Sequence, residues 1–279
     1  MTMLTTSDGV GLHVEEAGEG PPLLILPGWG VSAWWFREQF AARLTSQFRV
    51  ICYDPRGQGE SEKTERGQRV GRMAADLAEV IEHIDEPRVN LVAWSGGGST
   101  ALHYIELFGT QRLESLTLIG AGPKLLKSPE WDHGFLELTE ATAWVDLIRH
   151  DFDAAVRGLA PQFFARHPGD EFLEAAIRDM LKCHPAGMSR ASWDFLNGDF
   201  RDMLDQVDVP TLVVTGEQDT SVPAGNAPYL HEKISGSQLT VIGDAAHCPF
   251  LEQPDQFNSA LVDFLKTKQV EPYRRAAHR

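Results

Sequence analysis

The chain has 279 residues, of which 42% are hydrophobic, enough to bury one large core. Its formal net charge of −15, from 25 basic and 40 acidic residues, argues against nucleic acid or an anionic membrane surface as a partner. The three cysteines are widely spaced, which predicts free thiols in a reducing compartment. No apolar run reaches the roughly 18 residues of a membrane span, and the N-terminus has no signal-peptide pattern. We therefore expect a cytoplasmic protein.

Short apolar runs alternate with segments of helical periodicity along most of the chain. Residues 4–6 and 12–15 flank SDGVG and predict an antiparallel hairpin at a sheet edge. Six runs are typical of strands that are covered on both faces: residues 22–26, 48–53, 89–93, 116–119, 211–215 and 239–242. Helices are predicted at residues 34–45, 69–84 and 99–108. This alternation predicts an α/β fold, with a mostly parallel twisted sheet flanked by helices.

Residues 122–209 contain no strand pattern, only helical patches rich in aromatic residues. Because an insertion between two parallel strands lies over their carboxyl ends, where open α/β sheets bind ligands, we expect a helical cap over a site. The chain is therefore divided into a core of residues 1–122 and 207–279 and a cap of residues 123–206. We expect about a third of the aromatic residues of the insertion to line a pocket wall and the others to take part in ordinary packing. The nine aromatic residues considered are Trp131, Phe135, Trp144, Phe152, Phe163, Phe164, Phe172, Trp193 and Phe195.

The segment LVAWSGGGST places Ser95 at the corner between a predicted strand and a predicted helix. Such a sharp turn brings the residues two before and two after the serine close together, so both must be small, as Ala93 and Gly97 are. A glycine-rich phosphate loop is the competing interpretation, but no lysine follows the glycines as a P-loop requires. We therefore expect the hydroxyl of Ser95 to project above the sheet.

This turn resembles the nucleophile elbow of the α/β-hydrolases, and the resemblance covers nearly the whole chain outside the insertion. Ala93 stands where the family has its first glycine. The resemblance implies that Ser95 is the nucleophile of a triad in the chain order serine, acid, histidine. LTVIGDAAHCPFLEQP resembles the family's histidine loop and identifies His247 as the general base. Cys248, beside it, is expected to be a small buried residue rather than a nucleophile.

TGEQDTSVP resembles the family's acid turn, which identifies Asp219 as the residue that orients the imidazole. Glu217 and Asp208 fit this turn less well. The alternative position of the acid in the family, after residues 116–119, reads GAGPK and offers no carboxylate.

The resemblance also implies two backbone donors for a tetrahedral oxyanion. The first is the N–H of Gly96, directly after the nucleophile, and the second is the N–H of Trp29 in LILPGWG. Family members commonly have His-Gly in this loop, where the chain has Pro27 and Gly28. The donor is retained because it belongs to the backbone, but a side chain that usually helps to brace the loop is missing.

The resemblance implies a serine hydrolase that cleaves a small-molecule carboxylic ester or lactone with an apolar acyl or aryl part, without cofactor or metal. GWG and AAHCPF are similar to the pimeloyl-carrier methyl ester esterases, and GGGSTALHYIELFGTQR to the cofactor-free haloperoxidase and arylesterase branch. The predicted cap is acidic, which disfavours docking of an acidic carrier protein.

Two other functions use the same fold and triad. A small-ligand receptor would show slow or single turnover, and a cofactor-free haloperoxidase, perhydrolase or oxygenase would use the site for another reaction. The oxygenases usually carry a histidine after the elbow serine, and Gly96 in that position weighs against them. Epoxide hydrolases and haloalkane dehalogenases are disfavoured because they need a carboxylate at position 95. The sequence does not specify the oligomeric state.

Overall fold

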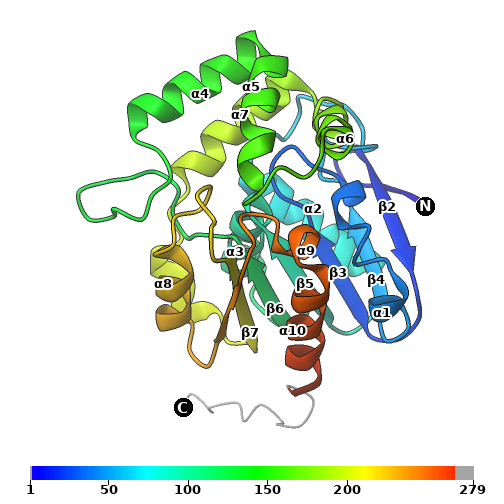
Figure 1. Ribbon diagram of the computed structural model, residues 1–279. Helices are drawn as coiled ribbons and strands as arrows, with labels where there is room; N and C mark the ends of the chain where they lie inside the picture. The colour runs from blue at the N-terminus through cyan, green and yellow to red at the C-terminus, as the bar shows by residue number, and fades with distance from the viewer. Residues whose placement is uncertain (1, 268–279) are drawn as a thin grey trace.

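A computed structural model describes residues 2–267, which fold around an eight-stranded sheet (Figure 1). The strands lie in the order β1-β2-β4-β3-β5-β6-β7-β8. The pairs β1/β2 and β2/β4 are antiparallel, and all other neighbours in the sheet are parallel. The strands are β1 (Thr2–Thr5), β2 (Gly11–Ala17), β3 (Pro22–Leu26), β4 (Arg49–Tyr53), β5 (Val89–Trp94), β6 (Leu113–Ile119), β7 (Thr211–Gly216) and β8 (Gln238–Ile242).

All predicted strands are found, with ends that differ by at most three residues. Every residue of β3 and β5 is buried, which explains why these strands appear in the sequence as continuous apolar runs. Alternate side chains of β3 enter two different cores: Leu24 and Leu26 pack on one side of the sheet, Leu23 and Ile25 on the other. The predicted α/β fold with a mostly parallel sheet is therefore confirmed.

Helices cover both faces of the sheet (Figure 1). One face carries α2 (Val70–His83), α3 (Gly96–Phe108) and α8 (Asn226–Lys233). The opposite face carries α1 (Ala42–Thr45), α9 (Pro249–Glu252) and α10 (Pro254–Thr267). The helix predicted at residues 99–108 begins three residues earlier, at Gly96, directly behind the elbow serine.

The prediction of a single helix over residues 34–45 is wrong. The structure has a short 3-10 helix, η1 (Ala33–Phe36), followed by turns and the four-residue α1. Between them the Gln39 side chain is buried, and its amide donates hydrogen bonds to the carbonyl of Phe250 and to Oδ1 of Asn258. The backbone N–H groups of Gln39 and Ala41 donate to carbonyls three residues earlier, as in tight turns, so no continuous α-helix forms here although the apolar spacing is compatible with one.

The chain between β6 and β7 forms the insertion that the sequence predicts. It contains α4 (Leu138–His150), α5 (Phe152–Leu159), η2 (Ala160–Phe163), α6 (Asp170–Met180), α7 (Pro185–Asn197) and η3 (Arg201–Gln206). Figure 1 shows α4 to α7, in green and yellow-green, above one end of the sheet. We call α4, α5, η2, α6 and α7 the cap helices.

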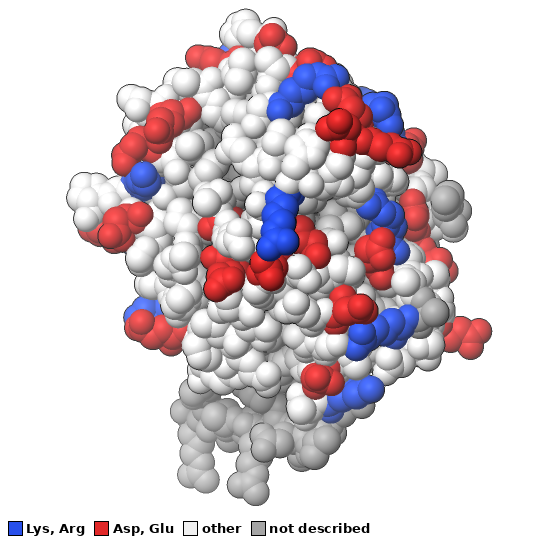
Figure 2. All heavy atoms as spheres, in the orientation of Figure 1, with Lys and Arg blue, Asp and Glu red and all other residues white. Residues whose placement is uncertain are grey.

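The face in Figure 2 carries acidic and basic side chains in close alternation, without an extended patch of Lys and Arg. Within residues 2–267, no helix has the length and apolar character that crossing a bilayer requires.

Candidate active site

Ser95 occupies a strained corner between β5 and α3. Its backbone has φ 54° and ψ −122°, a conformation that non-glycine residues rarely adopt and that costs about 1–3 kcal/mol. The N–H of Ser95 donates to the carbonyl of Ile119 at 2.9 Å, which ties the corner to the neighbouring strand β6. A Cβ atom on Gly97 would lie only 2.6 Å from the carbonyl oxygen of Leu26. Residue 97 is therefore restricted to glycine, as the elbow pattern predicts.

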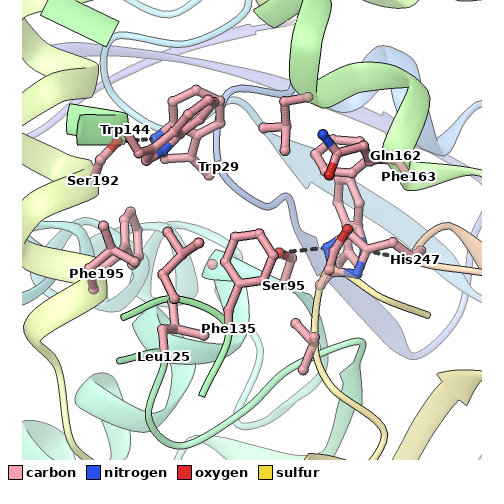
Figure 3. A pocket seen from close by; sticks show the side chains of 17 residues that line it. Trp29, Ser95, Leu125, Phe135, Trp144, Gln162, Phe163, Ser192, Phe195 and His247 are labelled. Carbon is pink, nitrogen blue, oxygen red and sulfur yellow. Dashed lines mark hydrogen bonds between the residues drawn. The ribbon is translucent and has the colours of Figure 1, made fainter. Parts of the chain in front are cut away.

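Three side chains from distant parts of the sequence meet at this corner. His247 Nε2 lies 2.9 Å from Ser95 Oγ, and His247 Nδ1 lies 2.9 Å from Asp219 Oδ2 (Figure 3). The side chains of His247 and Asp219 are almost completely buried, while Ser95 is half-buried and lines a cavity. The structure thus brings together all three residues that the resemblance assigns to a triad.

The carboxylate of Asp219 is oriented by the turn that follows β7. Its Oδ1 accepts the backbone N–H groups of Ser221 and Val222 at 2.9 and 3.0 Å, so Oδ2 is left to face the imidazole. Gly120, with φ +48°, makes room for this pair, because an added Cβ would lie 3.0 Å from His247 Nδ1. In the sequence, GAGPK stands out only as an alternative place for the acid, so the steric role of Gly120 was missed.

The backbone of His247 is fixed by residues that the sequence analysis did not assign to the site. The N–H of His247 donates to the carbonyl of Phe163 in η2, and the indole N–H of Trp94 donates to the carbonyl of His247. The imidazole lies beside the rings of Trp94 and Phe163, each with a centroid separation of 5.2 Å. One cap segment therefore contributes directly to the position of the histidine.

Glu252 connects the histidine loop to the cap. Its carboxylate accepts the N–H of Ala246, next to His247, and the N–H of Ala165, just after η2. Burial raises the pKa of this carboxyl, while the two amide donors act in the opposite direction. Cys248, the other neighbour of His247, is fully buried, and burial raises the pKa of its thiol well above the usual range. The prediction that Cys248 is a small buried residue is confirmed.

The two amides expected to bind an oxyanion lie beside each other. A Cβ built on Gly96 would be 3.3 Å from the backbone nitrogen of Trp29. Gly96 is the first residue of α3, so its N–H has no carbonyl partner within the helix. Within the described part of the chain, the N–H of Trp29 has no backbone acceptor either. Two amide donors are thus available next to the hydroxyl of Ser95.

A cavity of about 280 Å³ opens over the serine, and its wall is apolar (Figure 3). Of the nine aromatic residues listed above for the insertion, Phe135, Trp144, Phe163 and Phe195 line it, somewhat more than the predicted third. Leucines 125, 136, 159 and 196 fill the wall between them. Among the described residues, no Asp, Glu, Lys or Arg side chain lines the cavity. The polar groups of the lining outside the triad are Gln162, Ser192, Ser221 and the indole N–H groups of Trp29 and Trp94. Such a cavity fits an uncharged, apolar body attached to the reacting group.

No group of three or more His, Cys, Asp or Glu side chains within residues 2–267 is placed to hold a metal ion. The groups that meet at the site are the Ser95 hydroxyl, the His247 imidazole, the Asp219 carboxylate and the amides of Gly96 and Trp29.

Known proteins resemble this chain over nearly its full length. The family model described as "alpha/beta hydrolase fold" matches residues 21–254. A non-heme haloperoxidase of Rhodococcus erythropolis is 27% identical, over 96% of this chain and 100% of the relative. A pimeloyl-[acyl-carrier protein] methyl ester esterase of Nitrosospira multiformis is 28% identical, over 92% of this chain and 99% of the relative. The solved structure of an esterase from Exiguobacterium antarcticum superposes with a TM-score of 0.91 at 28% identity, covering 95% of this chain and 99% of the esterase.

Proposed function

The chain belongs to the α/β-hydrolase fold family, and on this premise we propose that it is a serine hydrolase that cleaves an uncharged carboxylic ester or lactone. The observation that carries the proposal is the hydrogen-bonded series from Ser95 through His247 to Asp219, located at the floor of an apolar cavity. A hydroxyl alone is a poor nucleophile, whereas one that faces a positioned imidazole can transfer its proton as it attacks.

In the first half of the reaction, Ser95 Oγ forms a bond to the carbonyl carbon and passes its proton to His247 Nε2. Asp219 stabilises the imidazolium that results, since its Oδ2 accepts the proton on Nδ1. The carbonyl oxygen becomes an oxyanion and accepts hydrogen bonds from the amides of Gly96 and Trp29. The bond to the leaving alkoxy group then breaks, and His247 Nε2 returns the proton to the departing oxygen.

In the second half, water takes the place of the alcohol. His247 Nε2 removes a proton from the water as its oxygen attacks the acyl carbon, and the same amides stabilise the second oxyanion. The ester bond to Ser95 breaks, the proton returns to Ser95 Oγ, and the carboxylic acid is released. Each residue ends in its starting state, so the cycle requires no cofactor.

The cap determines which substrate reaches the serine. We assign residues 123–206 to this cap and residues 1–122 and 207–279 to the core, with residues 1 and 268–279 outside the described part. The apolar lining supports a small-molecule substrate with an apolar acyl or aryl part. The cytoplasmic location predicted from the sequence remains a prediction.

Hydrolysis of p-nitrophenyl butyrate by the wild type and the Ser95→Ala variant tests this proposal. We expect the wild type to complete many turnovers per chain. The variant should have a kcat that is lower by about 10⁴-fold or more, with an unchanged unfolding midpoint. Ser99→Ala, one turn further along α3 and outside the cavity lining, is the control and should retain activity within about twofold. One slow turnover per chain in the wild type would instead indicate the ligand-receptor alternative. Equal activity in the wild type and in Ser95→Ala would refute the assignment of Ser95 as the nucleophile.

A further inference from the structure

Trp29 connects the proposed oxyanion site to the cap. Its backbone lies in the loop after β3, whereas its indole reaches into the insertion. The indole Nε1 donates a hydrogen bond of 2.7 Å to Oγ of Ser192 on α7 (Figure 3). The same ring packs against Trp144 of α4 and Phe152 of α5, with centroid separations of 5.7 and 6.4 Å. Three cap helices thus hold one residue of the core.

The hydroxyl of Ser192 is oriented to accept this bond. It is buried, and it donates its own proton to the carbonyl of Met188, one turn earlier in α7, at 2.7 Å. The lone pairs on Ser192 Oγ are therefore left to accept the indole N–H of Trp29. Loss of the hydroxyl would leave that indole N–H without its acceptor in a largely apolar wall.

The oxyanion loop has few other polar attachments at this point. Residues 27–30 read PGWG, and the indole of Trp29 is the only side chain among them that can form a hydrogen bond. The next polar attachment along the loop is the N–H of Val31, which donates to Oε1 of Gln58. The bond from Trp29 to Ser192 therefore braces this part of the loop from the cap side.

We propose that Ser192 is a positioning residue for catalysis: by holding the indole of Trp29 it fixes the Trp29 amide beside Gly96, where the oxyanion forms. This inference rests on the proposed hydrolase function. It makes the cap part of the catalytic machinery as well as a wall of the cavity, because a displacement of α7 would move an oxyanion donor. The contribution is expected to be smaller than the roughly 10²- to 10³-fold effect of deleting a donor, since the amide itself remains.

The experiment measures kcat and KM of the wild type, Ser192→Ala, Trp29→Phe and the double variant. The substrates are 4-nitrophenyl benzoate and its thionobenzoate analogue, whose C=S sulfur accepts hydrogen bonds weakly and so depends less on the oxyanion donors. We expect each single variant to lower kcat for the ester by about 10- to 30-fold, with KM within about threefold. The ratio of ester to thionoester rates should fall by about 10-fold. The double variant should be no slower than the slower single variant, because both changes remove the same hydrogen bond.

The control is Ser189→Ala, which removes a buried hydroxyl of α7 that donates to the Val145 carbonyl and contacts neither Trp29 nor the cavity. An unchanged rate ratio in Ser192→Ala, together with a stability loss like that of Ser189→Ala, would show that Ser192 has only a structural role. Additive effects in the double variant would likewise overturn the proposed coupling. A wild type that turns over neither substrate would refute the hydrolase function itself, and the inference with it.

Discussion

The two sides of the cavity are built in different ways. On the core side, Ser95, Asp219 and His247 follow the carboxyl ends of β5, β7 and β8, and hydrogen bonds of 2.9–3.0 Å fix their orientation. On the cap side, the wall is made mainly of rings and leucine side chains, which contact one another without directional bonds. The core side thus supplies the reacting groups, and the cap side determines the shape and polarity of what binds. Two cap contacts are exceptions, since Ser192 holds the indole of Trp29 and the Phe163 carbonyl holds the backbone of His247. Away from these contacts, a substitution on either side should affect mainly one of these properties.

Asp219→Asn should have the largest effect on the core side. Oδ1 of residue 219 accepts two backbone N–H groups, so the amide oxygen of the new side chain will occupy that place and its NH₂ group will face His247 Nδ1. The imidazole is then forced to carry its proton on Nε2, where it cannot accept the proton of Ser95. We expect kcat for p-nitrophenyl butyrate to fall about 10⁴-fold with little change in KM. Glu217→Gln, an exposed neighbour, is the control and should retain full activity.

Gly97→Ala should damage the geometry of the elbow rather than its chemistry. The new methyl would lie 2.6 Å from the carbonyl oxygen of Leu26 and 2.7 Å from that of Pro27, so the corner must shift. We expect a loss of about 2–4 kcal/mol in the free energy of unfolding and a fall in kcat of about 100-fold or more.

The matched substitution in the cap, Gly158→Ala, sharpens the contrast. Gly158 lies in α5, is exposed, and has no atom within 4 Å of an added Cβ. Alanine there should stabilise the protein by about 0.4–1 kcal/mol and leave kcat unchanged. Equal losses of stability in both variants, measured by denaturant unfolding, would contradict the assignment of strain to the elbow.

The third prediction concerns the cap side and substrate charge. Because no Asp, Glu, Lys or Arg of residues 2–267 lines the cavity, an acyl chain that ends in a carboxylate would lose hydration without gaining a cationic partner there. We expect kcat/KM for mono-p-nitrophenyl adipate to be about 30-fold lower than for p-nitrophenyl hexanoate, measured at neutral pH. The methyl ester of the adipate has the same chain without the charge and should react like the hexanoate. Comparable values for the acid and its methyl ester would contradict selection against charge.

Much of the core domain could be predicted from the sequence, because its strands and the serine turn depend on residues that are close together in the chain. A strand buried on both faces appears as a continuous apolar run, and the elbow needs small residues within two positions of Ser95. Asp219 and His247 could be located because each follows such a run in a recognisable turn. At residues 34–45 the apolar spacing fits a helix, but the segment forms turns. Its Gln39 bonds to Phe250, 211 residues further along the chain, a partner that local spacing does not report.

The residues of the site that the sequence did not reveal act through contacts between distant segments. Ser192 reaches the indole of Trp29 across 163 positions, and Phe163 contacts His247 through a backbone carbonyl, which has no signature in the residue type. Gly120 had a visible signal in GAG after a strand, but its role depends on the place that His247 takes in the folded chain. Periodicity and motifs do not report such pairings.

Labelling with a fluorophosphonate tests the central claim most directly, because the reagent captures an activated serine beside its oxyanion donors. Intact mass and peptide mapping are predicted to show one adduct per chain, on Ser95, formed rapidly in the wild type, much more slowly in Asp219→Asn and not at all in Ser95→Ala. The account would be contradicted if Ser95→Ala formed an adduct at the same rate and stoichiometry as the wild type. It would also be contradicted if an active wild type carried the adduct on another residue.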